Sequence, residues 1–161
     1  MGTHLATSLA AAGADVVVSD VDETRRRVAV DLGFGWADPA RALTLPADIV
    51  VPAAVGGVLS PDTVPLLDAP LVVGPANNQL TAESVADDLA DRGVTWVPDF
   101  VASAGGIVYT LARESDGLAH EAALARVEAI GDTVTAILSA ASAGGRTPLA
   151  EAAALAAQRV G

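Results

Sequence analysis

Residues 71–97 read LVVGPANNQLTAESVADDLADRGVTWV and place one helical segment between two short apolar runs. The runs at 71–73 and 94–97 are apolar and rich in β-branched residues, as is typical of buried strands. The helical segment begins with Thr81, a good N-cap residue, and stops at Gly93, a good residue to follow a helix. This order predicts a βαβ unit with two parallel strands.

The same alternation continues on both sides of this unit. Further apolar runs that predict strands lie at 15–19 and 48–51, with a weakly extended piece at 34–36. Predicted helices lie at 3–12, 22–32, 107–114, 119–141 and 148–159, with a short helix that ends at Leu67. The pattern predicts an α/β fold, a Rossmann-like doubly wound parallel sheet that ends in a group of C-terminal helices.

Side chains that carry chemistry are scarce in this sequence. The net charge is −11, the nine basic residues are all arginine, and there is no cysteine. An acidic chain is unsuited to nucleic acid or to anionic membrane surfaces, and no apolar run is long enough to predict a membrane span. Without lysine or cysteine, Schiff-base chemistry, a lysine base and a thiolate nucleophile are excluded within these residues. The length predicts one domain.

Small or polar segments follow each of the main predicted strands, where ligands bind in open α/β sheets. They are 19–20, 52–57, 74–78 and 98–99. Each one alone is compatible with an ordinary turn between a strand and a helix. Four in series favour a ligand-binding edge, because small residues let a ligand approach the backbone closely.

Asp20 ends the first apolar run and lies about 18 residues after Gly2. In dinucleotide-binding folds, an acid about 20 residues after the G-x-G-x-x-G motif bonds the ribose 2′-hydroxyl. A surface turn is the alternative interpretation of Asp20. If Gly2 is the last glycine of such a motif, the first two glycines and the first strand lie outside these residues. The sequence thus predicts a doubly wound sheet that lacks its first strand.

The pair Asn77–Asn78 follows the strand at 71–73 and has two interpretations. Asparagine tolerates the left-handed backbone conformation and forms turns through its side chain. The functional interpretation is that an amide bonds the carboxamide or carboxylate of a ligand.

Several segments together resemble a known family. They are MGTHLATSLAAAGADVVVSDVD, DIVVPAAVGGVLSPDTVPLL, LVVGPANNQL, RGVTWVPDFVASAGGIVYTLARE and EAIGDTV. The chain resembles the C-terminal NAD-binding domain of the leucine/valine/phenylalanine dehydrogenases, within the glutamate dehydrogenase superfamily. The resemblance implies a cytoplasmic homo-oligomer that oxidatively deaminates an apolar L-amino acid to a 2-oxo acid and ammonia. It also implies that residues 1–161 form a partial dinucleotide-binding domain, without the N-terminal domain that brings the catalytic lysines and aspartate.

The resemblance assigns roles to particular positions. The residues that it places against NAD are Gly2, Asp20, Val21, Ala53, Ala54, Val55, Ala76 and Asn77. The residues that it places against the amino-acid substrate are Asn77, Ser103, Ile107 and Thr110. At two of these positions the chain departs from the family, which usually carries cysteine in place of Ala53 and asparagine in place of Ser103.

Two functions are compatible with these observations. The first is an NAD-dependent amino-acid dehydrogenase, of which this chain alone is expected to be inactive because it supplies no catalytic lysine. The second is a dinucleotide-binding or assembly module without catalysis.

Overall fold

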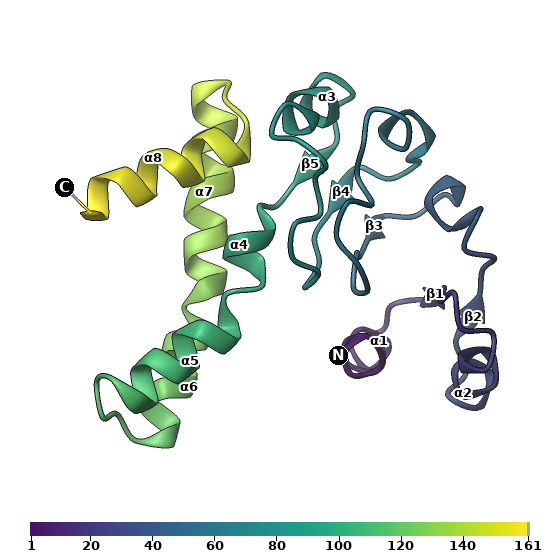
Figure 1. Cartoon of the computed structure of the whole chain (residues 1–161), viewed down its shortest axis with the longest axis horizontal. Helices are drawn as coiled ribbons and strands as arrows, with labels where there is room; N and C mark the ends of the chain where they lie inside the picture. The colour runs from purple at the N-terminus through teal and green to yellow at the C-terminus, as the bar shows by residue number, and fades with distance from the viewer. Residues whose placement is uncertain (161) are drawn as a thin grey trace.

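The computed structural model describes residues 1–160 as an α/β chain (Figure 1). Its strands are β1 Val17–Val18, β2 Gly35–Trp36, β3 Ile49–Val50, β4 Leu71–Val72 and β5 Thr95–Trp96. Its helices are α1 Gly2–Ala11, α2 Arg25–Asp31, α3 Val85–Asp91, α4 Asp99–Ala102, α5 Gly105–Glu114, α6 His120–Glu128, α7 Ile130–Gly144 and α8 Pro148–Val160, with the 3₁₀ turns η1 Ala42–Thr44 and η2 Val64–Leu66. The predicted alternation of strands and helices is confirmed.

The strands form two separate sheets. β1 pairs with β2, and β3–β4–β5 form the second sheet in that order, with every pair parallel. In the second sheet Leu71 lies between Ile49 and Thr95, so β4 is its central strand. The described residues therefore contain no hydrogen-bonded ladder between β1 and β3, although the two strands follow each other along the chain.

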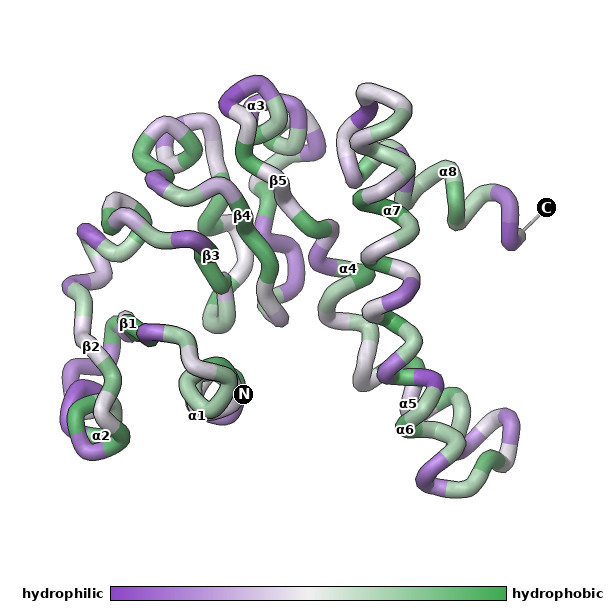
Figure 2. Tube along the Cα trace, turned by 180° about the vertical axis from the view of Figure 1, so that it is seen from behind, coloured by the Kyte–Doolittle hydropathy of each residue, from purple (hydrophilic) through white to green (hydrophobic). Residues whose placement is uncertain are grey.

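The hydrophobic core surrounds β4. Its buried members are Leu59, Val64, Leu67, Val72, Val85, Ala86, Leu89, Val94 and Trp96. They come from β4, β5, η2, α3 and the segments next to them, and Figure 2 shows hydrophobic positions along β3 and β4. By contrast, the buried residues among the first 40 are three alanines, Ala6, Ala29 and Ala37. The half of the molecule that holds β1 and β2 thus has little core of its own.

The C-terminal helices form a group beside the three-stranded sheet (Figure 1). α5 packs on α6, α7 packs on α4 and α8, and Leu149 at the start of α8 packs against the hydrophobic core. The hydroxyl of Thr147 accepts a hydrogen bond from the Ala150 N–H at 3.2 Å, so Thr147 caps the N-terminus of α8. Across residues 1–160, no helix has both the length and the apolar character of a membrane span.

Three helix predictions were wrong in detail. The predicted helix 119–141 is interrupted at Ala129, two residues before Gly131, and glycine is a weak helix former. The helix expected to start at Thr81 begins at Val85, since residues 82–87 first form hydrogen bonds three residues apart. The short helix α4 has no amphipathic period and was not predicted.

Candidate functional site

The loops after β3 and β4 lie against each other at the carboxyl ends of their strands. The N–H of Gly57 donates to the Asn78 carbonyl at 2.7 Å, and the N–H of Ala76 donates to the Pro52 carbonyl at 3.0 Å. The predicted segments 52–57 and 74–78 are thereby joined into one surface. Backbone bonds between loops hold such a surface rigid without the use of side chains.

Two glycines allow this close approach. A Cβ atom on Gly74 would lie 2.2 Å from the Pro52 carbonyl oxygen, and one on Gly56 would lie 2.7 Å from the Asn78 oxygen. Both distances are far below van der Waals contact, so only glycine fits at either position. The small residues after these strands therefore let the two loops approach each other.

Asn77 and Ser103 form the side-chain contact of this site. The Oγ of Ser103, between α4 and α5, donates to Oδ1 of Asn77 at 2.8 Å. Because the carboxamide oxygen accepts this bond, the amide nitrogen of Asn77 is turned away from Ser103 and remains a donor. Asn77 is exposed, so a carbonyl or carboxylate of a ligand can reach this donor.

Of the two asparagines, Asn78 is the one that forms the turn. Its φ of 53° lies in the left-handed region, which asparagine tolerates better than most residues. The turn interpretation is therefore confirmed for Asn78. For Asn77 the structure leaves the amide exposed, and the ligand interpretation stays a prediction.

A buried polar network beneath the site was missed by the sequence reasoning. The Gln79 side chain donates from Nε2 to the carbonyls of Gly74, at 2.8 Å, and Ala76, at 2.9 Å, and it accepts from Trp96 Nε1 at 3.0 Å. The Gln79 N–H donates to Asp99 Oδ2 at 2.6 Å. Gln79 is fully buried, so these bonds fix the turn that carries Asn77. Two features of the sequence could have indicated this network: Gln79 stands beside apolar Leu80, and Asp99 follows closely after the strand at 94–97.

Some of the other positions assigned to the cofactor lie near the joined loops, and others do not. A Cβ atom on Gly2 would lie 3.9 Å from the Ala53 Cβ, so the N-terminus of α1 faces the loop after β3. Ala54 and Val55 are exposed in the same loop, whereas Ala76 is buried. Gly2 is thereby brought next to the joined loops, of which Ala53 is a part.

Asp20 and Val21 follow β1, in the two-stranded sheet. Oδ1 of Asp20 accepts the Asp22 N–H at 2.9 Å, so this carboxylate forms a turn and retains a second oxygen. Hydrogen bonds from the hydroxyl and the N–H of Thr24 lower the pKa of the neighbouring Asp22 carboxyl. Val21 is 89% exposed. Among residues 1–160, no hydrogen bond or ion pair joins Asp20 to the loops 52–57 and 74–78.

Ile107 and Thr110 both lie on α5, as predicted, and both are exposed. Residues three apart on a helix share a face. α5 starts two residues after Ser103, so Ile107 and Thr110 follow the Ser103–Asn77 contact within seven positions along the chain. An exposed Ile107, at 64%, offers apolar surface to a ligand or to another chain segment.

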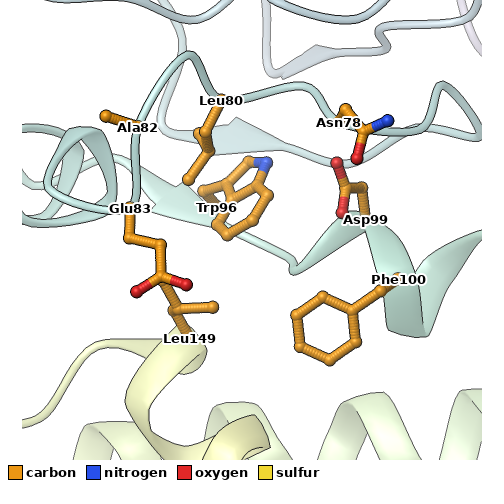
Figure 3. A pocket seen from close by; sticks show the side chains of 8 residues that line it. All are labelled: Asn78, Leu80, Ala82, Glu83, Trp96, Asp99, Phe100 and Leu149. Atoms are coloured by element: carbon orange, nitrogen blue, oxygen red, sulfur yellow. The ribbon is translucent and has the colours of Figure 1, made fainter.

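A cavity of about 280 Å³ lies next to this site (Figure 3). Trp96 and Phe100 form apolar walls, and the carboxylates of Glu83 and Asp99 line it as well. Asn78 borders the cavity, whereas the positions assigned to the substrate, Asn77 included, are not part of its lining. The cavity and the Asn77–Ser103 contact are therefore separate features.

A sequence profile described as Glutamate/Leucine/Phenylalanine/Valine dehydrogenase matches residues 8–160. The chain belongs to this family. The resemblance seen in the sequence is thereby confirmed, and the joined loops are part of a dehydrogenase-type α/β fold.

Curated members of the dehydrogenase family match nearly the whole chain. A valine dehydrogenase of Streptomyces coelicolor is 40% identical over 99% of this chain, and a leucine dehydrogenase of Bacillus cereus is 33% identical over 98%. The crystal structure of the L-tryptophan dehydrogenase from Nostoc punctiforme superposes with a TM-score of 0.83 at 36% identity, over 89% of this chain. The match covers 45%, 43% and 43% of these proteins, so the chain spans less than half of their length.

Proposed function

We propose that residues 1–161 are part of the dinucleotide-binding domain of an NAD-dependent L-amino-acid dehydrogenase. The reaction is the oxidative deamination of an apolar L-amino acid to its 2-oxo acid and ammonia. The observation that carries the proposal is the joined pair of loops at the carboxyl ends of β3 and β4, which presents the amide of Asn77. The names of the relatives, which are dehydrogenases of valine, leucine and tryptophan, support the reaction class.

We also propose that these residues lack the strand that comes first along the chain in a doubly wound fold. In the doubly wound fold the strands lie in the order 3-2-1-4-5-6. The observed orders β2–β1 and β3–β4–β5 correspond to positions 3-2 and 4-5-6. Position 1 would lie between β1 and β3, where the two sheets are not paired.

The proposed cofactor contacts suit an extended dinucleotide. The pyrophosphate would lie at the N-terminus of α1, by Gly2, where free N–H groups favour an anion. Asp20 would accept the adenosine 2′-hydroxyl with Val21 beside the ribose. Ala53, Ala54 and Val55 would line the cleft, and Ala76 and Asn77 would meet the nicotinamide end. The close approach at Gly56 and Gly74 supports this assignment only by holding the two loops together, so that the positions on both loops lie side by side.

NAD, when bound, accepts the hydride from the amino acid. The part of this chain is to orient the substrate: Asn77, aligned by Ser103, would donate to the substrate carboxylate, and Ile107 with Thr110 would contact its side chain. The bulk of Ile107 favours branched aliphatic side chains over a phenyl ring. The chain contains no lysine, so the proton would be removed by a group from outside these residues.

The absence of lysine also favours a second candidate, a dinucleotide-binding or assembly module without catalysis. The two candidates differ in what happens when a lysine-bearing domain is supplied. A dehydrogenase domain then supports turnover, whereas a pure binding module takes up NAD without forming NADH.

The test joins this chain to the part of the Streptomyces coelicolor valine dehydrogenase that lies outside the match. We expect NADH formation from NAD and L-valine or L-leucine by this chimera, and none above blank by the 161-residue chain alone. A chimera with Asn77→Ala is the control, because it keeps the fold and removes the amide donor. NAD binding without turnover in the chimera would favour the second candidate, and the absence of both would refute the proposal.

A further inference from the structure

The cavity of Figure 3 lies where the C-terminal helices meet the three-stranded sheet. Trp96 of β5 and Phe100 of α4 line it, and Leu149, near the start of α8, lines it from the side of the C-terminal helices. Its volume of about 280 Å³ lies just below the range of about 300–1,000 Å³ that is typical of pockets for drug-sized ligands. The space therefore suits a small occupant, with one ring or a short branched chain.

Asp99 is a buried acid on the wall of this cavity. It is 8% exposed, and its Oδ2 atom accepts the Gln79 N–H at 2.6 Å. Among residues 1–160, no hydrogen bond reaches its other oxygen, Oδ1. Every fully buried polar side-chain atom of these residues has a partner, so Oδ1 remains in contact with open space, and the space that Asp99 borders is the cavity. A carboxylate in such a position is stabilised by a positively charged donor.

The lining of the cavity carries negative charge without a neighbouring cation. Glu83 supplies a second carboxylate, and no arginine or histidine is part of the lining. Across residues 1–160, the arginines form their ion pairs with other acids, namely Asp22, Asp31, Asp116 and Glu151. The cavity therefore attracts cations and repels anions.

The aromatic walls favour an organic cation over a metal ion. Phe100 is 53% exposed, so its ring offers apolar surface that a ligand can cover. An ammonium group close to an aromatic face is attracted by the ring. A divalent metal ion needs several oxygen or nitrogen ligands, and residues 1–160 contain no group of three or more metal-ligating side chains.

We propose that this cavity binds a small primary amine that carries an apolar ring or chain. The ammonium group donates a hydrogen bond to Oδ1 of Asp99, and Glu83 adds to the attraction. The apolar part of the amine contacts the aromatic walls. A free amino acid binds poorly here, because its own carboxylate meets two carboxylates and no cation. The site lies apart from the contact assigned to the substrate, and the proposal does not rest on the proposed function.

The experiment titrates the 161-residue chain, without NAD, with phenethylamine and follows the indole N–H signals of its two tryptophans by NMR. Trp96 lines the cavity and Trp36 lies in β2, so the variant Trp36→Phe assigns the two signals. We expect the Trp96 signal to shift with a Kd of about 1 mM or lower, and the Trp36 signal to stay in place. Phenethyl alcohol, which lacks the charge, and L-phenylalanine, which adds a carboxylate, should each bind at least about tenfold more weakly.

Asp99→Asn should raise the Kd for phenethylamine by about tenfold or more, because it removes the charge while its amide oxygen can still accept from Gln79. Phe100→Ala, at an exposed position, should raise the Kd by about threefold. Asp62→Asn is the matched control, since Asp62 is an exposed acid outside the lining, and it should leave the Kd unchanged.

Three results would each overturn the inference. The first is a Trp96 signal that does not move at phenethylamine concentrations well above the expected Kd. The second is equally tight binding of phenethyl alcohol or L-phenylalanine. The third is an unchanged Kd in Asp99→Asn or, if that variant does not fold, in Phe100→Ala. None of these measurements uses NAD, so the proposed function is tested separately.

Discussion

Ser103 Oγ lies 2.8 Å from Asn77 Oδ1, and this bond joins the start of the C-terminal helices to the loop after β4. It decides which end of the Asn77 carboxamide faces a ligand. An asparagine side chain without such a partner can present either its oxygen or its nitrogen. The contact therefore leads to the first prediction.

Replacement Ser103→Ala in the chimeric dehydrogenase should raise the KM for L-valine by a few-fold to about tenfold, which corresponds to the loss of one hydrogen bond. The variant Ser103→Asn should keep the KM close to that of the unchanged chimera, because its amide can donate to Asn77 Oδ1 in place of the hydroxyl. Steady-state kinetics with NAD in excess measures the effect, and Ser115→Ala after α5 is the control. An unchanged KM in Ser103→Ala would show that Asn77 needs no alignment.

Replacement Gln79→Leu should lower the free energy of unfolding by about 2–5 kcal/mol, because it leaves buried partners without hydrogen bonds. Those partners are Trp96 Nε1 and the carbonyls of Gly74 and Ala76. Urea denaturation followed by circular dichroism is the measurement. Gln158→Leu on the exposed surface of α8 is the matched control and should change stability by less than about 0.5 kcal/mol. Equal effects of the two changes would contradict the network.

Two glycine-to-alanine changes should have opposite effects on the free energy of unfolding. Gly74→Ala places a Cβ atom 2.2 Å from the Pro52 oxygen and should separate the joined loops, at a cost of more than about 2 kcal/mol. Gly131→Ala meets no atom within 4 Å and should stabilise α7 by about 0.5–1 kcal/mol. Thermal denaturation of both variants checks the pair. A tolerated alanine at residue 74 would mean that the two loops do not lie in contact.

Asp20→Ala in the chimera should reduce the preference for NAD over NADP by about tenfold or more, since a carboxylate accepts the ribose 2′-hydroxyl and repels a 2′-phosphate. Asp20→Asn separates charge from turn formation, because its amide oxygen can still accept the Asp22 N–H. The measurement is the ratio of kcat/KM for the two cofactors. Equal efficiency with both cofactors, unaffected by either substitution, would refute the role of Asp20.

The order of strands and helices could be predicted because it depends on local patterns. Apolar runs such as 71–73 and turn residues such as Gly93 are visible in any single sequence. The split of the helix 119–141 could not be predicted, because the segments on both sides of Ala129 favour a helix and Ala129 is itself a strong helix former.

In the candidate site, too, local features could be predicted and long-range contacts could not. The segments 52–57 and 74–78 could be identified as strand ends, since their small residues are local signals. The contact of Ser103 with Asn77 and the network of Gln79 with Asp99 depend on residues that are 26 and 20 positions apart. Such pairs arise from the three-dimensional arrangement of loops, and no period in the sequence encodes them.

The uneven core also determines where a protease attacks. Trypsin cuts after lysine or arginine, and all nine basic residues here are arginines. Arg25, Arg26 and Arg27 are exposed at the start of α2, within the first 40 residues, which bury only alanines. Segments with few buried contacts open most readily and are cut first. Brief digestion should therefore remove α1 and β1 and leave a trypsin-resistant remainder built around β4.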